Sequence, residues 1–199
     1  MNIPGASFLL IFTLALNACV SSPEEDKGSS EKLLAEPPTG WVLTYQLNNV
    51  TSRLSEFVPA QESVSDWSTK LSFESFLELA HIDPIQALLT EVEQDKKRCD
   101  FVQHFNLYSG LENSYPSSVR LFFCGKKKET ETGEVKMIKV IQGSNYLYII
   151  TFVKKVEPFK PGEAEIKKEE IAGWSTYLRG ISLCDSENKS HSCPVPALP

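Results

Sequence analysis

The chain has 199 residues, with 26 acidic and 20 basic side chains and a formal net charge of −6 at neutral pH. Its 41% apolar content is enough for a packed core, which excludes a wholly disordered chain. Nucleic-acid binding needs a basic face, so the acidic balance predicts no nucleic-acid partner.

Residues 1–18 are typical of a secretory signal peptide. Residues 6–16 form an apolar run, and no charged side chain occurs before Glu24. This run is shorter than the roughly 20 residues that a transmembrane helix requires. Ala18 supplies the small residue that precedes a signal cleavage point. We therefore predict export, although no basic residue precedes the apolar run.

The residues Leu16-Asn17-Ala18-Cys19 resemble the lipobox of bacterial lipoproteins. The resemblance implies cleavage before Cys19 and fatty acylation of its thiol, often with acylation of the new amine as well. Two or three acyl chains give a lasting anchor, whereas one is reversible. Val20, in place of the Asp that retains lipoproteins in the inner membrane of enteric bacteria, implies the periplasmic side of the cell outer membrane. The alternative is an ordinary signal peptide of a secreted protein, with Cys19 as a disulfide cysteine.

Residues 19–40 are rich in Ser, Glu and Pro, a composition that buries too little apolar surface to fold alone. We expect a lipidated cysteine followed by a flexible linker over this range. A single globular domain with a Pro-rich tail is then predicted for residues 41–199.

The first half of the domain combines strand and helix patterns. Residues 41–47 predict a strand, residues 57–65 a connection, and residues 67–77 a strand that leads into a helix. Asp83-Pro84 predicts a helix start, because Asp caps helices and Pro suits their first turn. Apolar residues at helical spacing and late basic residues follow.

Residues 101–153 give the clearest strand signal and predict an antiparallel meander of three or four strands. Residues 125–133 are expected to form an exposed hairpin, and Lys136 is expected to face solvent. Residues 163–180 predict a second helix. The predicted fold class is therefore α+β, with an antiparallel β-meander packed against two helices in one domain.

Five cysteines are an odd number for an exported protein. Lipidation of Cys19 would leave an even set, which allows three pairings, and an oxidising compartment favours two disulfides. We favour the two local pairings, Cys99–Cys124 and Cys184–Cys193. A metal site formed by Cys184, Asp185, His191 and Cys193 is a weaker alternative, because the usual Cys-x₂₋₄-Cys spacing is absent. A Cys–His nucleophile is weaker still, since it would need a reduced thiolate.

The sequence contains no catalytic or cofactor-binding motif that we recognise, so we predict no enzyme activity, no metal and no cofactor. The residues Glu62, Ser63, Ser65 and Asp66 are close in sequence but lack a Gly-x-Ser-x-Gly elbow. The histidines His81, His104 and His191 are interpreted as structural. The basic run Lys126-Lys127-Lys128 is interpreted as a solvated hairpin tip, and a contact with anionic headgroups or an acidic partner is the alternative.

Three stretches, residues 62–67, 121–126 and 133–148, are similar to a group of small proteobacterial envelope lipoproteins. Some proteins of this kind decorate the outer-membrane core of type IVB (Dot/Icm-type) secretion machines. The resemblance implies a non-catalytic outer-membrane lipoprotein with envelope protein partners. The alternatives are a periplasmic module that binds a small ligand or peptide, on the sheet face or in a gap beside Trp67, and a hydrolase acting on envelope material.

Overall fold

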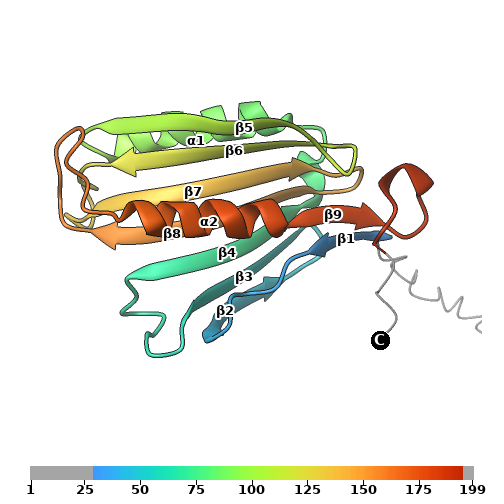
Figure 1. Ribbon diagram of the computed structural model, residues 1–199, viewed down its shortest axis with the longest axis horizontal. Helices are drawn as coiled ribbons and strands as arrows, with labels where there is room; N and C mark the ends of the chain where they lie inside the picture. The colour runs from blue at the N-terminus through green and yellow to red at the C-terminus, as the bar shows by residue number, and fades with distance from the viewer. Residues whose placement is uncertain (1–28, 195–199) are drawn as a thin grey trace, which may run out of the picture.

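The computed structural model describes residues 29–194, and an antiparallel sheet of seven strands forms its centre (Figure 1). The strand order across the sheet is β2-β3-β4-β8-β7-β6-β5. Strands β5 to β8 are consecutive and form the predicted meander, while β4 pairs with β8 and joins the remaining three strands to it. The strands are β2 Trp41–Asn48, β3 Ser52–Pro59, β4 Thr69–Phe76, β5 Val102–Glu112, β6 Tyr115–Cys124, β7 Gly133–Gln142 and β8 Leu147–Val156.

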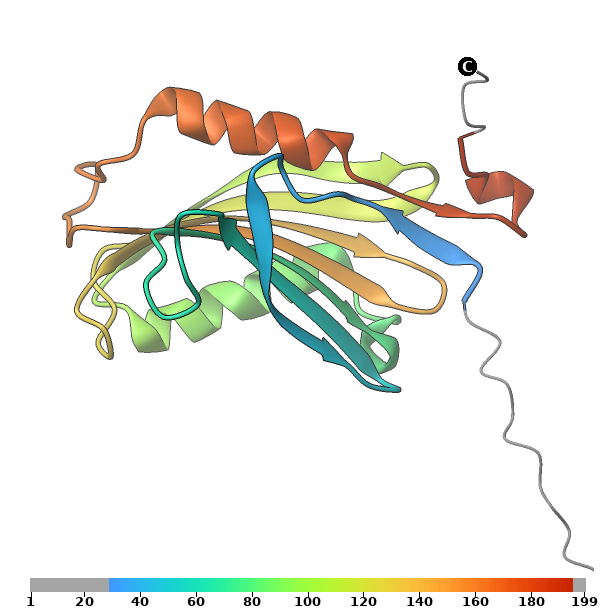
Figure 2. The same cartoon turned by 90° about the horizontal axis from the view of Figure 1, so that it is seen from below.

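Two helices lie on opposite faces of this sheet, α1 (Pro84–Arg98) on one and α2 (Lys168–Gly180) on the other (Figure 2). A two-stranded ribbon of β1 (Glu31–Leu34) and β9 (Ser182–Asp185) continues the α2 layer. Short 3₁₀ helices cover Leu77–Leu79 and Lys189–His191. The predicted α+β class, with an antiparallel sheet, two helices and two disulfides, is confirmed.

The hydrophobic core has two parts because both faces of the central strands are covered. On the α2 face, Phe152 stacks on Trp174 with parallel rings whose centroids lie 5.4 Å apart. On the α1 face, Leu88 and Val92 pack against Phe122 of β6. A strand covered on both sides reads as a nearly continuous apolar run, which accounts for the sequence of β8.

Helix α1 begins as the sequence predicts. The side chain of Asp83 accepts hydrogen bonds from the backbone N–H groups of Ile85 and Gln86, at 2.8 and 3.2 Å. Pro84 occupies the first turn, and three basic residues occupy the last. These features satisfy free N–H groups at the start and complement the helix dipole at the end.

Helix α2 is shorter than predicted, because it begins at Lys168 and not at residue 163. Pro161 and Gly162 form a turn before it, and Gly162 has a φ of +85°. Its C-terminal end is held by Lys139, whose fully buried Nζ donates to the carbonyl oxygens of Leu178 and Ile181 at 2.7 and 2.6 Å.

Two further local features differ from expectation. Residues 52–59 form strand β3, whereas the sequence predicted a connection from residue 57. Alternating Ser, Arg and Glu side chains hid this strand, which lies in the less covered part of the sheet. Lys136 is 6% exposed and does not face solvent, because α1 covers that face of β7.

The structure also differs from the flexible linker that we expected over residues 19–40. Within the described part of that range, Glu31–Leu34 form β1, which pairs antiparallel with β9. Glu31 is 7% exposed, and its carboxylate accepts hydrogen bonds from the backbone N–H groups of Ser144 and Asn145. The pairing partner comes from the far end of the chain, so local composition carried no sign of it.

Both predicted disulfides are present. Cys99, the residue that ends α1, is bonded to Cys124 at the end of β6. Cys184 of β9 is bonded to Cys193, which follows the last 3₁₀ helix. The first bond fixes the end of α1 to the sheet, and the second fixes the tail to the β1–β9 ribbon. Cys19 lies outside the described residues.

Candidate functional site

Helix α1 covers only half of its face of the sheet. It packs on β5, β6 and β7, whereas β3, β4 and the adjoining side of β8 extend beyond it (Figure 2). A groove of about 440 Å³ lies along this boundary. We call it the α1 groove; its walls come from α1, β3, β4, β7 and β8. The volume falls within the range of roughly 300–1,000 Å³ that is usual for ligand pockets.

The α1 groove has apolar and charged walls. Four acidic and four basic side chains line it, together with aliphatic residues of β7 and β8. The acidic residues are Glu56, Glu74, Glu91 and Glu134, and the basic residues are Lys70, Arg98, Lys127 and Lys136.

Most of these charges form ion pairs. Lys70 Nζ lies 2.5 Å from Glu56 Oε1, and Lys127 Nζ lies 2.9 Å from Glu134 Oε2. At the α1 wall, Lys136 contacts both Glu91 and Asp95. A positively charged side chain therefore neutralises each of these carboxylates.

Arg98 completes the network at the α1 wall. Its Nη2 lies 2.9 Å from Glu91 Oε1 and 2.8 Å from Asp95 Oδ1. Asp95 and Lys136 are buried, whereas Arg98 and Glu91 are partly exposed, so the network extends from the interior to the surface. Removing one member of such a network leaves an uncompensated buried charge, which destabilises the fold strongly.

Glu74 is the exception among these carboxylates. Among residues 29–194, no Lys, Arg or His nitrogen lies within 4 Å of its oxygens. Its one hydrogen bond comes from Ser72, whose Oγ donates to Glu74 Oε1 at 3.1 Å. Burial raises the pKa of Glu74 above its usual range, and repulsion from Glu56 and Glu91 adds to this shift. The Ser72 hydrogen bond and the more distant charge of Lys70 oppose it.

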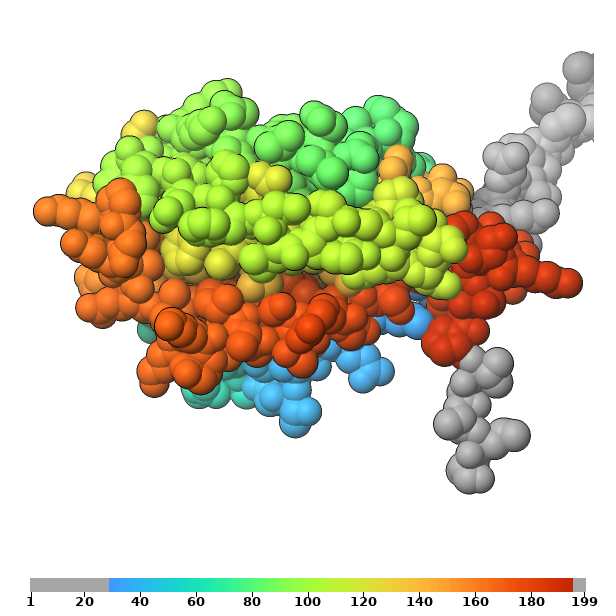
Figure 3. All heavy atoms as spheres, turned by 45° about the horizontal axis from the view of Figure 1, so that its top comes forward, coloured from blue at the N-terminus to red at the C-terminus, as the bar shows by residue number. Residues whose placement is uncertain are grey.

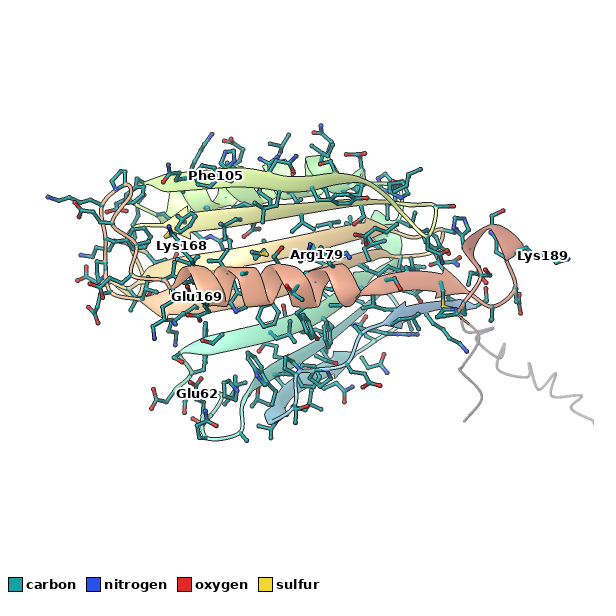
Figure 4. The ribbon with its side chains drawn as sticks, viewed as in Figure 1. Glu62, Phe105, Lys168, Glu169, Arg179 and Lys189 are labelled. Carbon is teal, nitrogen blue, oxygen red and sulfur yellow. A yellow bond between two sulfur atoms is a disulfide. The ribbon has the colours of Figure 1, made fainter. Side chains whose placement is uncertain are left out.

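Trp67 lies at the end of the α1 groove that β4 forms. The Nζ atoms of Lys70 and Lys155 lie 4.9 and 3.9 Å from the ring centroid of Trp67. The preceding loop is held by Glu62, labelled in Figure 4, whose carboxylate accepts from the backbone N–H and the hydroxyl of Ser68. The gap that we expected beside Trp67 thus corresponds to this end of the groove.

The histidines and serines that we considered are not assembled into a catalytic arrangement within residues 29–194. His104 Nδ1 lies 3.0 Å from Arg120 Nη1, and burial together with this arginine lowers the pKa of His104. His191 stacks on Tyr115, with ring centres 3.9 Å apart, and His81 is exposed. Ser63 and Ser65 contact each other in an exposed loop.

The proposed metal and thiolate alternatives do not fit the structure. Cys184 and Cys193 form a disulfide, so neither supplies a thiolate ligand or nucleophile. Over residues 29–194, no cluster of three or more His, Cys, Asp or Glu side chains is placed to hold a metal ion. In the same part of the chain, no helix has the length and apolar content that crossing a bilayer requires.

The basic hairpin tip is tied to the rest of the domain. Lys127 pairs with Glu134, and Lys126 Nζ lies 3.0 Å from Glu131 Oε1. Lys128 Nζ donates to the carbonyl oxygen of Lys97 at the end of α1, at 2.8 Å. These contacts account for the three lysines without an anionic ligand.

A second hollow, of about 430 Å³, lies between β5, β6 and the segment before α2. Figure 3 shows a furrow between the atoms of β5 and those of α2, and Figure 4 shows Phe105 and Lys168 at this end of the molecule. The lining is mainly apolar and includes Phe123, Phe159 and Ile166. No charged pair or unpartnered carboxylate distinguishes it, so we regard the α1 groove as the better candidate site.

The two edge strands of the sheet expose apolar side chains. On β2 these include Leu43 and Tyr45, and on β5 they include Leu107 and Leu111. Each edge is interrupted by a register shift, between residues 43 and 45 in β2 and between 106 and 108 in β5. Such bulges hinder pairing with another strand, so the exposed side chains are surfaces for side-chain contacts.

Comparisons with known proteins give no family for this chain. No protein-family model matches it, and a search of curated proteins finds no similar sequence. The function is therefore argued from the residues of the site.

Sequence reasoning missed the residue that distinguishes the α1 groove. Glu74 lies in Ser72-Phe73-Glu74-Ser75-Phe76, where polar and aromatic residues alternate. This alternation signals a strand with a polar face, which usually means exposure to solvent. The signal did not show that α1 would border this face and bury the carboxylate.

Proposed function

We propose that this protein is a non-catalytic, lipid-anchored protein of the bacterial outer membrane, whose domain contributes an interaction surface to a cell-envelope assembly. The observation that carries the proposal is the pairing of four cysteines in two disulfides. This pairing accounts for every cysteine of residues 29–194, and the remaining cysteine of the sequence is Cys19 in the lipobox-like stretch.

Two physical arguments support this proposal. Disulfides form and persist in oxidising compartments such as the periplasm and are rare in the cytosol. A thiol destined for acylation must also stay out of disulfide exchange, and here each other cysteine has a partner. The resemblance to envelope lipoproteins makes a secretion system the assembly to examine first.

The test is mass spectrometry of the mature N-terminus together with membrane fractionation. We expect a chain that begins at Cys19 and carries the mass of two or three acyl chains. Replacing Cys19→Ala should release the protein from the membrane fraction. An unmodified Cys19 in a soluble protein would refute the anchor.

A matched variant, Val20→Asp, tests the choice of membrane. In an enteric host we expect this variant to stay acylated and membrane-bound but to move from the outer to the inner membrane. Purification from detergent-solubilised outer membranes should also bring down envelope proteins, and recovery of the protein alone would contradict an assembly role.

A second candidate function is binding of a small ligand or peptide in the α1 groove. The specific observation that favours it is the combination of a 440 Å³ groove with an ion-pair network along one wall and Glu74 without a cationic partner. Ligand pockets commonly combine apolar walls with a few placed polar groups. Binding of this kind is compatible with the membrane anchor.

A further inference from the structure

Hydrocarbon side chains flank Glu74 along the sheet, and Glu56, Glu91 and Lys70 are its charged neighbours. The strand register places Glu74 of β4 opposite Leu54 of β3 on one side and Ile149 of β8 on the other. Phe76 follows two residues later on the same face of β4. Residues directly opposite on paired strands lie about 4.5–5.5 Å apart. The carboxyl group therefore sits among hydrocarbon side chains, with Ser72 as its hydrogen-bond donor.

The charge balance of the α1 groove leaves one acid in excess. Four basic residues line the groove, and they neutralise Glu56, Glu91, Glu134 and the adjoining Asp95. Within the described chain, Glu74 is the lining acid that remains without such a contact. Burying a carboxylate without a cation is unfavourable. Because Glu74 borders an open groove, a ligand with a positive charge could supply the missing partner.

We propose that the α1 groove binds a ligand through a primary ammonium or guanidinium group that pairs with Glu74. The inference rests on the second candidate function, ligand binding in the groove, and does not depend on the membrane anchor. It adds the charge of the ligand and the residue that selects it.

The walls of the groove also define the part of the ligand that carries this group. Ile149 and Val153 of β8, with Leu79 beyond β4, provide hydrocarbon contacts along the approach to Glu74. An aliphatic stem with a cationic end matches this arrangement, because the stem packs on apolar surface while the head is paired. A lysine or arginine side chain of a peptide and a free alkylamine share this chemistry.

The alternative state of the site is a protonated Glu74 that needs no cation. Burial disfavours the ionised form of Glu74 and raises its pKa. A bound ammonium group would reverse this preference, because an opposite charge at short distance favours the ionised form. Binding should therefore be strongest where Glu74 ionises readily and should weaken as the pH falls.

The experiment is a titration of the purified full-length protein followed by nuclear magnetic resonance. The first probe is a terminally blocked Gly-Gly-Lys-Gly-Gly peptide, and its neutral partner carries Nε-acetyllysine in place of lysine. The third probe is 1,5-diaminopentane, a free alkylamine. Shifts of the Trp67 indole resonance and of the backbone amides of Ser72, Glu74 and Thr151 report occupancy of the α1 groove.

We expect the lysine peptide to shift these resonances and the acetylated peptide to bind at least ten-fold more weakly. Glu74→Gln should reduce affinity for the lysine peptide at least ten-fold. The control is Glu170→Gln, which changes a similarly exposed acid on the α2 face that has Lys154 as its partner; its affinity should stay within about three-fold of the natural protein. If diaminopentane binds as well as the lysine peptide, the ligand of the groove is a free alkylamine.

Three results would overturn the proposal. The first is equal binding of the lysine and acetyllysine peptides, which would leave a groove that binds ligands without selecting charge. The second is unchanged affinity after Glu74→Gln in a protein that melts as the natural one does. The third is the absence of shifts with every cationic probe, and this result would leave the membrane-anchor proposal intact because acylation is measured separately.

Discussion

The two halves of the α1 face of the sheet differ in how their charged side chains are paired. In the half under α1, the charged side chains of β7 find partners on the helix, as Lys136 does with Glu91 and Asp95. In the half that α1 leaves open, Glu74 projects from β4 with Ser72 as its donor. The strands are continuous and antiparallel across both halves, so the width of one helix decides which charged groups of the sheet find a partner on α1.

The largest effect that this comparison predicts is for Lys136→Ala. The substitution removes a cation from Asp95, which is almost fully buried, and from Glu91, whose side chain is 26% exposed. Breaking a buried ion pair in this way costs about 3–5 kcal/mol of the free energy of unfolding. Urea unfolding at neutral pH measures the effect.

The matched control is Lys70→Ala in the open half. Lys70 and its partner Glu56 have side chains that are 23% and 19% exposed, so solvent compensates part of the loss. We expect a cost of about 1 kcal/mol or less. Equal losses for the two variants would show that coverage by α1 does not set the strength of these pairs.

The second prediction concerns the bond that fixes α1 to the sheet. Replacing both Cys99 and Cys124 with Ala opens a loop with a sequence separation of 25 residues, which corresponds to about 3.5 kcal/mol of loop-closure entropy. Exchange of the amide hydrogens in the last turn of α1 should accelerate most. The corresponding double variant of Cys184 and Cys193 opens a loop with a sequence separation of 9 residues, and a loss of about 2.6 kcal/mol in the free energy of unfolding is expected for it.

The third prediction is a gain of stability, whereas the first two are losses. Glu74 has a raised pKa in the folded state, so the carboxyl group lowers stability as the pH rises from about 4.5, its ordinary value, through the raised value. Its neighbours are Glu56 on β3, Lys70 and Ser72 on β4, and Glu91 on α1. Glu74→Gln should therefore raise the free energy of unfolding at pH 7–8, by on the order of 1 kcal/mol.

Thermal unfolding of the natural protein and of Glu74→Gln across pH 4 to 8 measures this difference. The gain should shrink toward pH 4, where Glu74 is protonated in both the folded and the unfolded chain. A loss of stability at pH 8 would mean that the carboxylate is paired in the empty groove. Gain of stability with loss of cation binding is the expected signature of a residue kept for binding.

The smallest predicted difference in stability is between substitutions of two hydroxyl side chains. Ser118 lies fully buried on β6, and its Oγ donates to the carbonyl oxygen of Tyr108 at 2.9 Å. Ser118→Ala should cost about 1 kcal/mol. Thr151→Val, which changes a hydroxyl at the wall of the open groove, should change stability by less than about 0.5 kcal/mol. Urea unfolding of both variants checks the order.

Much of the fold was accessible from the sequence because its signals are local. The Asp83-Pro84 start of α1 rests on capping atoms within three residues, and the β5–β8 meander rests on alternation along each strand. The disulfide pairing followed from favouring short loops. The helix start and the strands needed only neighbouring residues, the disulfides needed only the choice of the shorter loops, and each inference is confirmed.

The parts that escaped prediction depend on contacts between distant segments. β1 forms only because β9 lies beside it, and Lys136 is buried only because α1 crosses β7. The role of Glu74 depends on the same crossing, since the edge of α1 turns a polar strand face into a groove. Periodicity identifies the faces of a strand but does not specify what covers them.

The contact between Glu31 and the turn that joins β7 to β8 limits how far the domain can stand from a membrane anchor. The carboxylate of Glu31 is held by the turn between β7 and β8, so the chain is fixed to the domain from β1 onward. If Cys19 carries the anchor, residues 20–30 are the whole connection, and eleven residues reach at most about 40 Å when fully stretched. The β1–β9 end of the domain would then lie toward the bilayer, and a partner that contacts this end must be met within that distance of the lipid headgroups.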